Sequence, residues 1–423
     1  MPASGWSGRS APSRAYRRSK DRARTPLSAV TNHTPSNPAG IDYIERARAF
    51  APVLAAHSDE IERGRELPET LRSALIERGF FRLLLPRSLG GAELLPAAFV
   101  QVIGEIAKAD ASAAWCLNQT AGCSMTAAYL EPEAAREIFG GPRGILAWGP
   151  GPGEARVVAG GYRVTATFSF ASGSHDATWL AAHVPIIEAD GMPRRNPDGS
   201  PVIRDMLFPK AEAEMTDIWQ VIGLRGTGSD KYSVTDLFVP ERHSVSRNDA
   251  GARRENGPLY HFSNLQLYSS GFAGVAMGIA RGTLDAFIEL SRDKIPRGAK
   301  RTLRDNNVVQ SQVAQAEARL AAARAFLLGS LDDITREVER TGRLTLEQRM
   351  TIRLASTFAI HQARDTVDTA YHAAGATAIF ATNPFERRFR DIHTVSQQLQ
   401  GRQEHYETVG QFLLGLDPDT AWL

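Results

Sequence analysis

The sequence changes its hydrophobic period twice, and this order limits the folds open to the chain. Apolar residues recur at three and four positions from Ile41 to near Gly140, which is typical of helices. From there to Pro240 the chain is dense in glycine and proline and carries short alternating runs, of which Tyr162–Phe168 is the clearest. Beyond Gly257 the pattern is helical to the end. The chain is therefore predicted to be α+β, with an N-terminal helical domain, a middle antiparallel β-domain and a C-terminal four-helix bundle.

The chain divides into four expected segments: residues 1–40 as a disordered basic arm, 41–142 as the helical domain, 143–250 as the β-domain and 251–423 as the helical bundle. The arm is rich in Ser, Pro and Arg and has no apolar period. Its composition fits either a transit peptide or an over-long start-codon choice. The arm holds six Arg and one Lys against one Asp, so its net charge is +6. The whole chain has a net charge of +2, so the rest of the chain carries about −4. The body therefore has no basic field, and nucleic-acid binding is not expected.

Four long helices are expected in the last third of the chain, at Leu265–Ser291, Val308–Leu331, Thr345–His372 and Arg402–Leu416. Pro384–Gly401 is interpreted as the entry to the last of them. Glycines at three- and four-residue spacing on one side of the first helix predict a groove that another helix approaches closely: Gly271, Gly274, Gly278 and Gly282. No apolar run reaches the roughly 20 residues of a membrane span. We therefore expect no membrane partner and a cytoplasmic location.

Cys116 and Cys123 lie seven residues apart in a predicted helix. A helix rises about 10 Å over that distance, which is too far for a disulfide. Buried free thiols in a reducing compartment are the prediction.

The segment Ser112–Tyr129 combines many small residues with two buried-looking amides. Small residues let a helix approach another backbone or a flat ligand, and tight helix packing alone explains them equally well. Asn118 and Gln119 are polar groups in an otherwise apolar helix, and buried amides need partners. We take both as candidate substrate-binding residues.

Four motifs occur in order along the chain: LLPRSLGGAEL at Leu84–Leu94, FASGSHDATW at Phe170–Trp179, GLRGTGSDKYSVTDLFVP at Gly223–Pro240 and YHAAGATAIF at Tyr371–Phe380. Each motif is weak alone. In this order, with the helical and β segments between them, they resemble the acyl-CoA dehydrogenase superfamily from Ile41 onward. The resemblance implies an acyl-CoA dehydrogenase-like fold and a flavin cofactor.

The resemblance also implies flavin-contacting residues. Ser172, followed by Gly173, would place its hydroxyl at the flavin N5, although a serine that only shapes a turn is the alternative. Trp148 would form a wall of the ring site, or else belong to the core. Arg225 and Thr227 belong to a glycine-rich run suited to an anion.

Two further residues are implied on the cofactor's adenine side. Gly375 resembles the turn that meets a neighbouring subunit's cofactor, and Gln310 resembles a Gln that follows an Arg-x-x-Phe-Gly run. Here the run is Arg297-Gly298-Ala299-Lys300 and lacks the Phe. FMN is therefore the first choice of cofactor, and FAD stays open.

The catalytic base of a dehydrogenase is missing from both places where the family keeps it. No acidic residue occurs from Ile392 to Gly401, and none from Ser263 to Thr283. Abstraction of a weakly acidic α-proton requires such a carboxylate. The chain therefore resembles more closely the oxygenase components of two-component flavin monooxygenases, which receive reduced flavin from a separate reductase and use O2 on an apolar or aromatic substrate.

In that branch, Ser172 and His393 would be catalytic, and His393 is equally well explained as a structural bridge. Gln398 stands after Gln397 where many branch members carry a second His, and an amide can orient a substrate but cannot take its proton. Gln398 is kept as a catalytic candidate and Gln397 as a substrate contact. The resemblance implies a homotetramer.

Two alternatives stay open at this stage. One is an FAD-dependent acyl-CoA dehydrogenase acting on an acyl thioester, and the other is a non-catalytic scaffold that retains the fold. No metal-ligand spacing is present, so no metal is expected.

Overall fold

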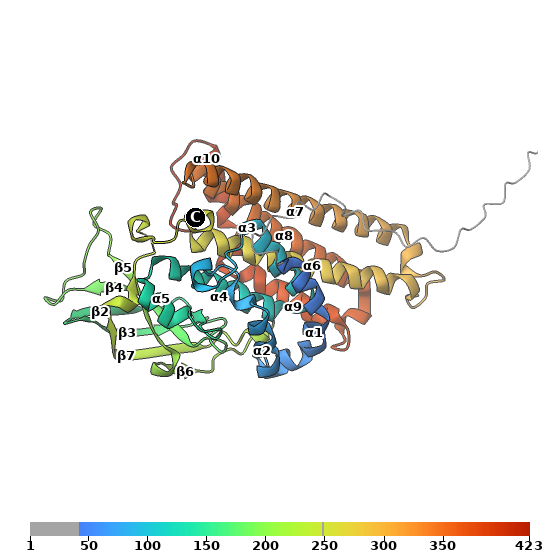
Figure 1. Cartoon of the computed structure of the whole chain (residues 1–423). Helices are drawn as coiled ribbons and strands as arrows, with labels where there is room; N and C mark the ends of the chain where they lie inside the picture. Colours follow the sequence, from blue (N-terminus) through green and yellow to red (C-terminus); the bar gives the residue numbers. More distant parts are fainter. Residues whose placement is uncertain (1–41, 248) are drawn as a thin grey trace, which may run out of the picture. The chain divides into compact units, whose positions relative to one another are not determined.

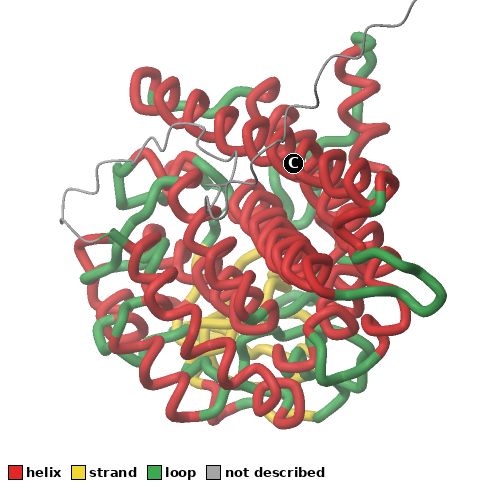
Figure 2. Tube along the Cα trace, turned by 90° about the vertical axis from the view of Figure 1, so that its right-hand side faces the viewer, coloured by secondary structure: helices red, strands yellow, loops and turns green. Residues whose placement is uncertain are grey.

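The computed structural model of the chain describes residues 42–247 and 249–423. Residues 1–40, for which the sequence predicts a disordered basic arm, lie outside the described residues. In the described part the strands gather in one region and helices make up the rest, as Figure 1 and Figure 2 show. The predicted α+β class is confirmed. Residues 42–423 belong to one compact unit, and the expected domain limits near residues 142 and 250 stay predictions.

Polar caps define where the N-terminal helices begin. Asp42 Oδ1 accepts hydrogen bonds from Ile44 N at 2.9 Å and Glu45 N at 3.1 Å. Asp110 is extended between two helices and caps the second, accepting from Ala113 N at 2.8 Å. The helices described in this part are α1 (Tyr43–Gly64), α2 (Glu69–Glu77), α3 (Pro96–Ala109), α4 (Ala111–Ser124) and α5 (Pro132–Phe139).

The middle of the chain forms one sheet, ordered β6-β7-β3-β2-β4-β5-β8, with β1 paired to β4. On β3, every second residue from Tyr162 to Phe168 is buried, as the sequence alternation predicts. The strands are β1 (Leu146–Ala147), β2 (Gly153–Val158), β3 (Gly161–Phe168), β4 (Trp179–Ile187), β5 (Ile203–Pro209), β6 (Glu214–Thr216), β7 (Lys231–Pro240) and β8 (Ser244–Val245).

The expectation of a wholly antiparallel sheet is wrong at two pairings. β2 runs parallel to β4, with Ala155 opposite Ile186, and β1 is also parallel to β4. The other pairings are antiparallel. Alternation of apolar residues reports which face of a strand is buried, and it carries no information about strand direction. The connection from β3 to β4 contains the turn that carries Ser172.

The C-terminal part contains the long helices α6 (Asn264–Asp293), α7 (Asn307–Thr341) and α8 (Leu346–Ala374), followed by α9 (Pro384–Gln397) and the short α10 (Glu404–Leu413). α8 packs against α6, α7 and α9, and α6 also packs against α9. Figure 1 shows the long helices side by side. These contacts make a bundle.

The fourth helix of that bundle is α9, not the predicted Arg402–Leu416 helix. Pro384 occupies the first turn of α9, where its missing N–H is not needed. The helix ends at Gln397; the next residue, Gln398, has an extended backbone, and a 3₁₀ turn follows at Leu399–Gly401. The Arg-rich segment is therefore a helix of the bundle, not an entry to one.

The glycine groove on α6 is confirmed, and α3 lies in it. A Cβ on Gly278 would lie 2.4 Å from Gly104 O, and one on Gly274 would lie 2.9 Å from Val100 O. Such distances leave no room for a methyl group. The groove therefore sets the distance between α3 and α6, and α4 packs against both helices.

Two further predictions concern the helices. Cys116 and Cys123 are buried free thiols, as expected. Burial raises the pKa of Cys123 to about 12, so this thiol stays protonated at neutral pH. In the described residues, no helix is long and apolar enough to cross a membrane.

Candidate active site

Ser172 lies in a tight turn directly after β3. The turn needs a left-handed backbone at Phe170 (φ +57°) and at Gly173 (φ +77°). A Cβ on Gly173 would lie 2.6 Å from Thr120 Cγ2, so the glycine lets the turn pack onto α4. Ser172 itself is 5% exposed. Phe170, in contrast, is 61% exposed and makes an edge contact with Trp219 at 6.0 Å between ring centroids.

A chain of hydrogen bonds starts at α4 and passes through Ser172. Trp115 Nε1 donates to Ser172 Oγ at 2.9 Å. Ser172 Oγ lies 2.6 Å from Ser229 Oγ, which lies 2.7 Å from Thr227 Oγ1. Thr227 Oγ1 donates to Leu224 O at 2.9 Å. The predicted residues Ser172 and Thr227 are thus joined through Ser229, and we call these residues the hydroxyl chain.

Trp115 and Ser229 were not among the predicted site residues. Each lies 57 positions from Ser172 in the sequence, so only the fold brings the three together. Trp115 has a signal in the sequence as the one large aromatic residue among the small residues of its helix. Ser229 has none beyond its place in the Arg225–Ser229 run.

Aromatic rings pack between α4 and α6. Trp115 lies over Phe272 at 4.0 Å between centroids, and Phe272 stacks on Tyr268 at 5.9 Å. A Cβ on Gly122 would lie 2.2 Å from Tyr268 Cε1, so the absence of a side chain there admits the Tyr268 ring. We call Trp115, Phe272 and Tyr268 the aromatic ladder. It begins at the Ser172 hydroxyl and continues along α6, and its three rings are buried.

Gln119 ties the ladder to the β-domain. Its Nε2 donates to Trp148 O at 3.2 Å and to Tyr268 OH at 3.3 Å. Tyr268 OH also lies 3.4 Å from Cys123 Sγ. Burial holds the pKa of Tyr268 well above its usual value, so the phenol remains protonated. Gln119, predicted as a substrate contact, therefore already has protein partners for its amide nitrogen.

Trp148 is buried against a charged group of the β-domain. Its ring meets His183 edge-on at 4.7 Å, and the Arg247 guanidinium lies 4.6 Å from its centroid. Asp205 forms ion pairs with both His183 and Arg247. Burial opposes ionisation of Asp205, but the charges of Arg247 and His183 hold its pKa below the usual range. His183 and Arg247, both paired with Asp205, thus fix the position of the Trp148 ring. These three residues were not predicted as site residues.

Asn118 is a buried amide without a protein partner. It is 0% exposed, and neither Nδ2 nor Oδ1 has a hydrogen bond. A Cβ on Gly271 would lie 1.8 Å from Asn118 Oδ1, so the groove of α6 makes room for this side chain. Buried amides without partners are rare and need an explanation such as water or a ligand. The prediction that Asn118 contacts substrate stays open.

The Arg-rich part of α9 fastens the bundle to the rest of the chain. Arg388 donates to Gly282 O at 2.8 Å and to Lys108 O at 3.0 Å. Asp391 Oδ1 accepts from Leu224 N at 2.7 Å, directly beside the hydroxyl chain. Burial raises the pKa of Asp391 to about 7. This carboxyl group is engaged in holding the Leu224 loop.

His393 points to the other side of α9. Its Nε2 lies 2.9 Å from Asp368 Oδ1 on α8, and its ring lies 4.4 Å from that of Phe389. Gln398 Oε1 accepts from Gln400 N at 2.7 Å and shapes the 3₁₀ turn, whereas Gln397 is exposed. Within residues 42–247 and 249–423, no hydrogen bond or ring contact joins these three side chains to the hydroxyl chain.

Among the described residues, no hydrogen bond joins the side chains of the remaining predicted cofactor residues to Ser172. The Arg225 side chain is 42% exposed, with Glu62 Oε1 at 3.9 Å. Gln310 is exposed on α7 and donates to Arg304 O at 2.9 Å. Gly375 ends α8 with φ +58°. Exposure leaves Arg225 and Gln310 free to bind a ligand, and their predicted roles are not tested by the fold.

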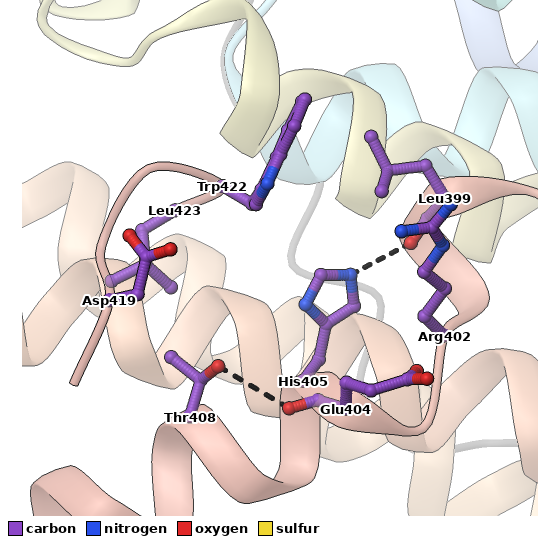
Figure 3. A pocket seen from close by; sticks show the side chains of 8 residues that line it. All are labelled: Leu399, Arg402, Glu404, His405, Thr408, Asp419, Trp422 and Leu423. Atoms are coloured by element: carbon purple, nitrogen blue, oxygen red, sulfur yellow. Dashed lines mark hydrogen bonds between the residues drawn. The ribbon is translucent and has the colours of Figure 1, made fainter.

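A pocket of about 190 Å³ lies elsewhere, between α10 and the chain's last residues. Figure 3 shows its lining, with His405 bonded to Leu399 O at 2.8 Å. The lining residues are Leu399, Arg402, Glu404, His405, Thr408, Asp419, Trp422 and Leu423. None of the predicted site residues lines this pocket, so its volume says nothing about the chemistry at Ser172.

The residues around Ser172 fit a flavin better than a metal. Ser172 Oγ accepts one hydrogen bond from Trp115 and retains an acceptor position, and the exposed Phe170 ring belongs to the same turn. Among the described residues, no group of three or more His, Cys, Asp or Glu side chains could hold a metal ion.

Comparison with known proteins adds independent information. The family models described as "Acyl-CoA dehydrogenase, N-terminal domain" and "Acyl-CoA dehydrogenase, C-terminal domain" match residues 42–138 and 270–401. The chain is similar to indole-3-acetate monooxygenase of Pseudomonas putida, at 29% identity over 373 residues, which cover 87% of this chain and 92% of that protein. It is also similar to the flavin-dependent monooxygenase oxygenase subunit HsaA of Rhodococcus jostii, at 28% identity, covering 83% and 92%. The crystal structure of HsaA from M. tuberculosis matches with a TM-score of 0.82 at 26% identity, covering 90% and 99%.

Proposed function

The chain belongs to the acyl-CoA dehydrogenase superfamily and is a flavin-dependent oxidoreductase, and we propose that it is the oxygenase component of a two-component monooxygenase. In this proposal a separate reductase supplies reduced flavin, and the protein uses it with O2 on an aromatic small molecule. The HsaA relative is named an "oxygenase subunit", and this name supports the proposal of a separate reductase.

The observation that carries the proposal is the absence of a carboxylate from the two segments where a dehydrogenase would hold its base. α6 holds no acidic residue from 264 to 284, and the chain holds none from 392 to 401. Asp391, the last acidic residue of α9, is buried and bonded to Leu224 N. Removal of an α-proton from an acyl thioester therefore has no base available in these segments.

The side chains around Ser172 support binding and orientation. Ser172 would meet the N5 edge of the isoalloxazine, and Trp148 would stand beside the ring, held there by its contacts with His183 and Arg247. When bound, reduced flavin would supply the reaction with O2. The aromatic ladder and the buried Tyr268 phenol exclude water from the side of α4 and α6.

An aromatic substrate would pack against aromatic rings of the site. Stacked and edge-to-face contacts between aromatic rings contribute about 0.5–1.5 kcal/mol beyond burial. The relative from Pseudomonas putida is named for indole-3-acetate, an aromatic compound. Asn118 and Gln119 on α4 would orient a polar substituent, with Gln397 as a further contact.

His393 would accept or polarise a substrate proton, with Asp368 fixing its ring through the 2.9 Å contact. Gln398 would hold the 3₁₀ turn beside it. FMN is the first choice of flavin because the Phe of the adenine-binding run is absent, and FAD is the alternative. Gln310 and Gly375 would reach a cofactor only across a homotetramer contact, and a cytoplasmic location is part of the same proposal.

Flavin binding and oxygen reactivity test the function together. The purified protein is titrated without oxygen with reduced FMN and reduced FAD, and each complex is then mixed with oxygenated buffer in a stopped-flow spectrometer. We expect saturable binding at micromolar flavin and a transient spectrum that differs from both reduced and oxidised flavin. No binding of either flavin contradicts the proposal, and so does reduction of the bound oxidised flavin by an acyl-CoA.

A further inference from the structure

The loop that precedes the hydroxyl chain lies against α9 and is held there by contacts at consecutive residues. Arg390 Nη1 donates to Ile222 O at 2.5 Å. A Cβ on Gly223 would lie 2.2 Å from Arg390 O, so no side chain fits between the loop and the helix at this point. Asp391 Oδ1 accepts from Leu224 N at 2.7 Å. We call these three loop residues the clasp loop, because two neighbouring side chains of α9 hold it.

The backbone of Leu224 needs such support. Its φ of +52° is left-handed, which is unfavourable for a residue with a side chain. Conformations of this kind are kept only where the surrounding contacts fix them. Asp391 provides the contact at the Leu224 N–H, and the Leu224 side chain is buried. The loop would therefore relax if the Asp391 contact were removed.

The carbonyl oxygen of Leu224 is the meeting point of two branches of contacts. Thr227 Oγ1 donates to this oxygen at 2.9 Å, and the hydroxyl chain continues from Thr227 to Ser172. Trp219 Nε1 also donates to it, at 3.0 Å, and the Trp219 ring meets Phe170 edge-on. Phe170 and Ser172 belong to the same turn. Both branches from Leu224 O therefore return to the turn that carries Ser172.

These contacts form a continuous path from α9 to the candidate site. We infer that Asp391 is a positioning residue for the Ser172 turn and acts on it through the backbone of Leu224. The role of this positioning in catalysis rests on the proposed function, because only there does Ser172 act on flavin. A carboxylate that merely stabilised α9 would be bonded within the helix bundle, as Arg388 is, whereas Asp391 is bonded to the clasp loop.

The same helix carries His393 two residues later. Two positions along a helix correspond to a turn of about 200°, so Asp391 and His393 leave α9 on opposite sides. His393 reaches Asp368 on α8, and Asp391 reaches the clasp loop. One helix thus sets the distance between the two predicted catalytic residues, His393 directly and Ser172 through the loop. A displaced loop would change this distance while α9 stayed in place.

The charge of Asp391 is not required for its contact with the loop. Burial raises the pKa of Asp391 to about 7, and both protonation forms keep an oxygen that can accept the Leu224 N–H. Asp391→Asn keeps such an oxygen, whereas Asp391→Ala removes it. A comparison of the two variants therefore separates the hydrogen bond from the charge.

Spectra of the indole N–H groups test the inference without flavin. Tryptophan labelled with nitrogen-15 is incorporated, and the two relevant NMR signals are assigned with Trp115→Phe and Trp219→Phe. Both indoles donate to oxygens whose places depend on Leu224. We expect both signals to shift in Asp391→Ala and to stay near their wild-type positions in Asp391→Asn. Unchanged signals in Asp391→Ala overturn the inference, and so does an equal shift in Asp391→Asn.

Two further variants separate positioning from a general loss of folding. Arg388→Met is the matched control, because Arg388 also lies on α9 but donates to Gly282 O and Lys108 O, away from the loop. Both indole signals should be unchanged there, and shifts as large as those of Asp391→Ala would contradict the account. Gly223→Ala pushes the loop away from α9 with the carboxyl group intact. It should shift both signals, which gives a second test should Asp391→Ala fold poorly; unshifted signals count against the inference.

Hydrogen peroxide release links the clasp loop to the reaction. With FMN bound, Asp391→Ala should release peroxide roughly two- to tenfold faster than the wild type, the effect of one lost hydrogen bond. Adding Asp391→Ala to Ser172→Ala should bring no further increase, because both changes act on the same hydroxyl. Independent, multiplying effects overturn the positioning role. Failure of the wild type to bind flavin contradicts the proposed function instead, and the indole signals still decide whether Asp391 positions the turn.

Discussion

Replacing Gly278 by Ala tests whether the close approach of α3 to α6 carries stability. The new methyl group would lie 2.4 Å from Gly104 O and 2.6 Å from Ala107 Cβ. Ordinary contacts of this kind lie at about 3.5 Å, so α3 would have to retreat by about 1 Å. One obstructing atom belongs to the backbone, so no side chain can rotate away.

The magnitude follows from two opposing terms. Overpacking of this kind costs about 1–3 kcal/mol. Ala in a helix is favoured over Gly by about 1 kcal/mol. The net expectation for Gly278→Ala is a loss of about 1 kcal/mol in the free energy of unfolding, the middle of a range of about 0–2 kcal/mol. Gly329→Ala on α7 is the matched control, because nothing lies within 4 Å of its added Cβ. It should gain up to about 1 kcal/mol.

Urea unfolding followed by circular dichroism measures both variants. The midpoint should fall for Gly278→Ala and rise for Gly329→Ala, with the slope unchanged. If Gly278→Ala proved as stable as Gly329→Ala, α3 and α6 would be free to separate, and the groove would not fix their distance.

Three further predictions follow from the site. Asp391→Asn should flatten the pH dependence of stability: the folded pKa of about 7 lies above the usual 3.8, so the wild type loses stability as the pH rises from about 4 to above 7. Urea midpoints of both proteins at pH 5 and pH 8 measure this. If the midpoint of Asp391→Asn changed with pH as much as that of the wild type, the prediction would be contradicted. Ser172→Ala should hasten hydrogen peroxide release from the oxygenated complex, measured by a peroxidase assay; an unchanged rate would remove Ser172 from the mechanism. His393→Asn should lower product formation by about 10²–10⁴-fold with flavin affinity intact; lower stability with normal product yield would instead identify a structural bridge to Asp368.

Sequence patterns predicted features that depend on local spacing. The glycines of α6 recur at helical spacing. Their groove could be predicted because a row of missing side chains lets any neighbouring helix approach more closely. The alternation on β3 likewise predicted its buried face. Strand direction was not predictable in this way, and the parallel pairing of β2 with β4 was missed. The helix at Pro384–Gln397 was also missed: Phe385, Ile392 and Val395 form a narrow apolar stripe on it, but polar residues outnumber them in this segment.

The candidate site was only partly predictable, because its contacts join distant segments. Ser172 and Thr227 were predicted as site residues, and hydrogen bonds through Ser229 join them. Ser229 has no local pattern that marks it, and Trp115 is marked only as the one large aromatic residue of its helix. His393 was predicted from the family resemblance, and its partner Asp368 lies 25 positions earlier on another helix. Pairings over such separations depend on how helices pack, which a single sequence does not contain.

Incorporation of labelled oxygen tests the central claim most directly. The protein is incubated with a flavin reductase, NADH, FMN and a panel of aromatic compounds such as indole and indole-3-acetate under oxygen-18 gas, and products are analysed by mass spectrometry. The account predicts a product that carries one labelled oxygen atom and depends on the reductase. Unlabelled product throughout, together with anaerobic reduction of the bound flavin by an acyl-CoA, would contradict it.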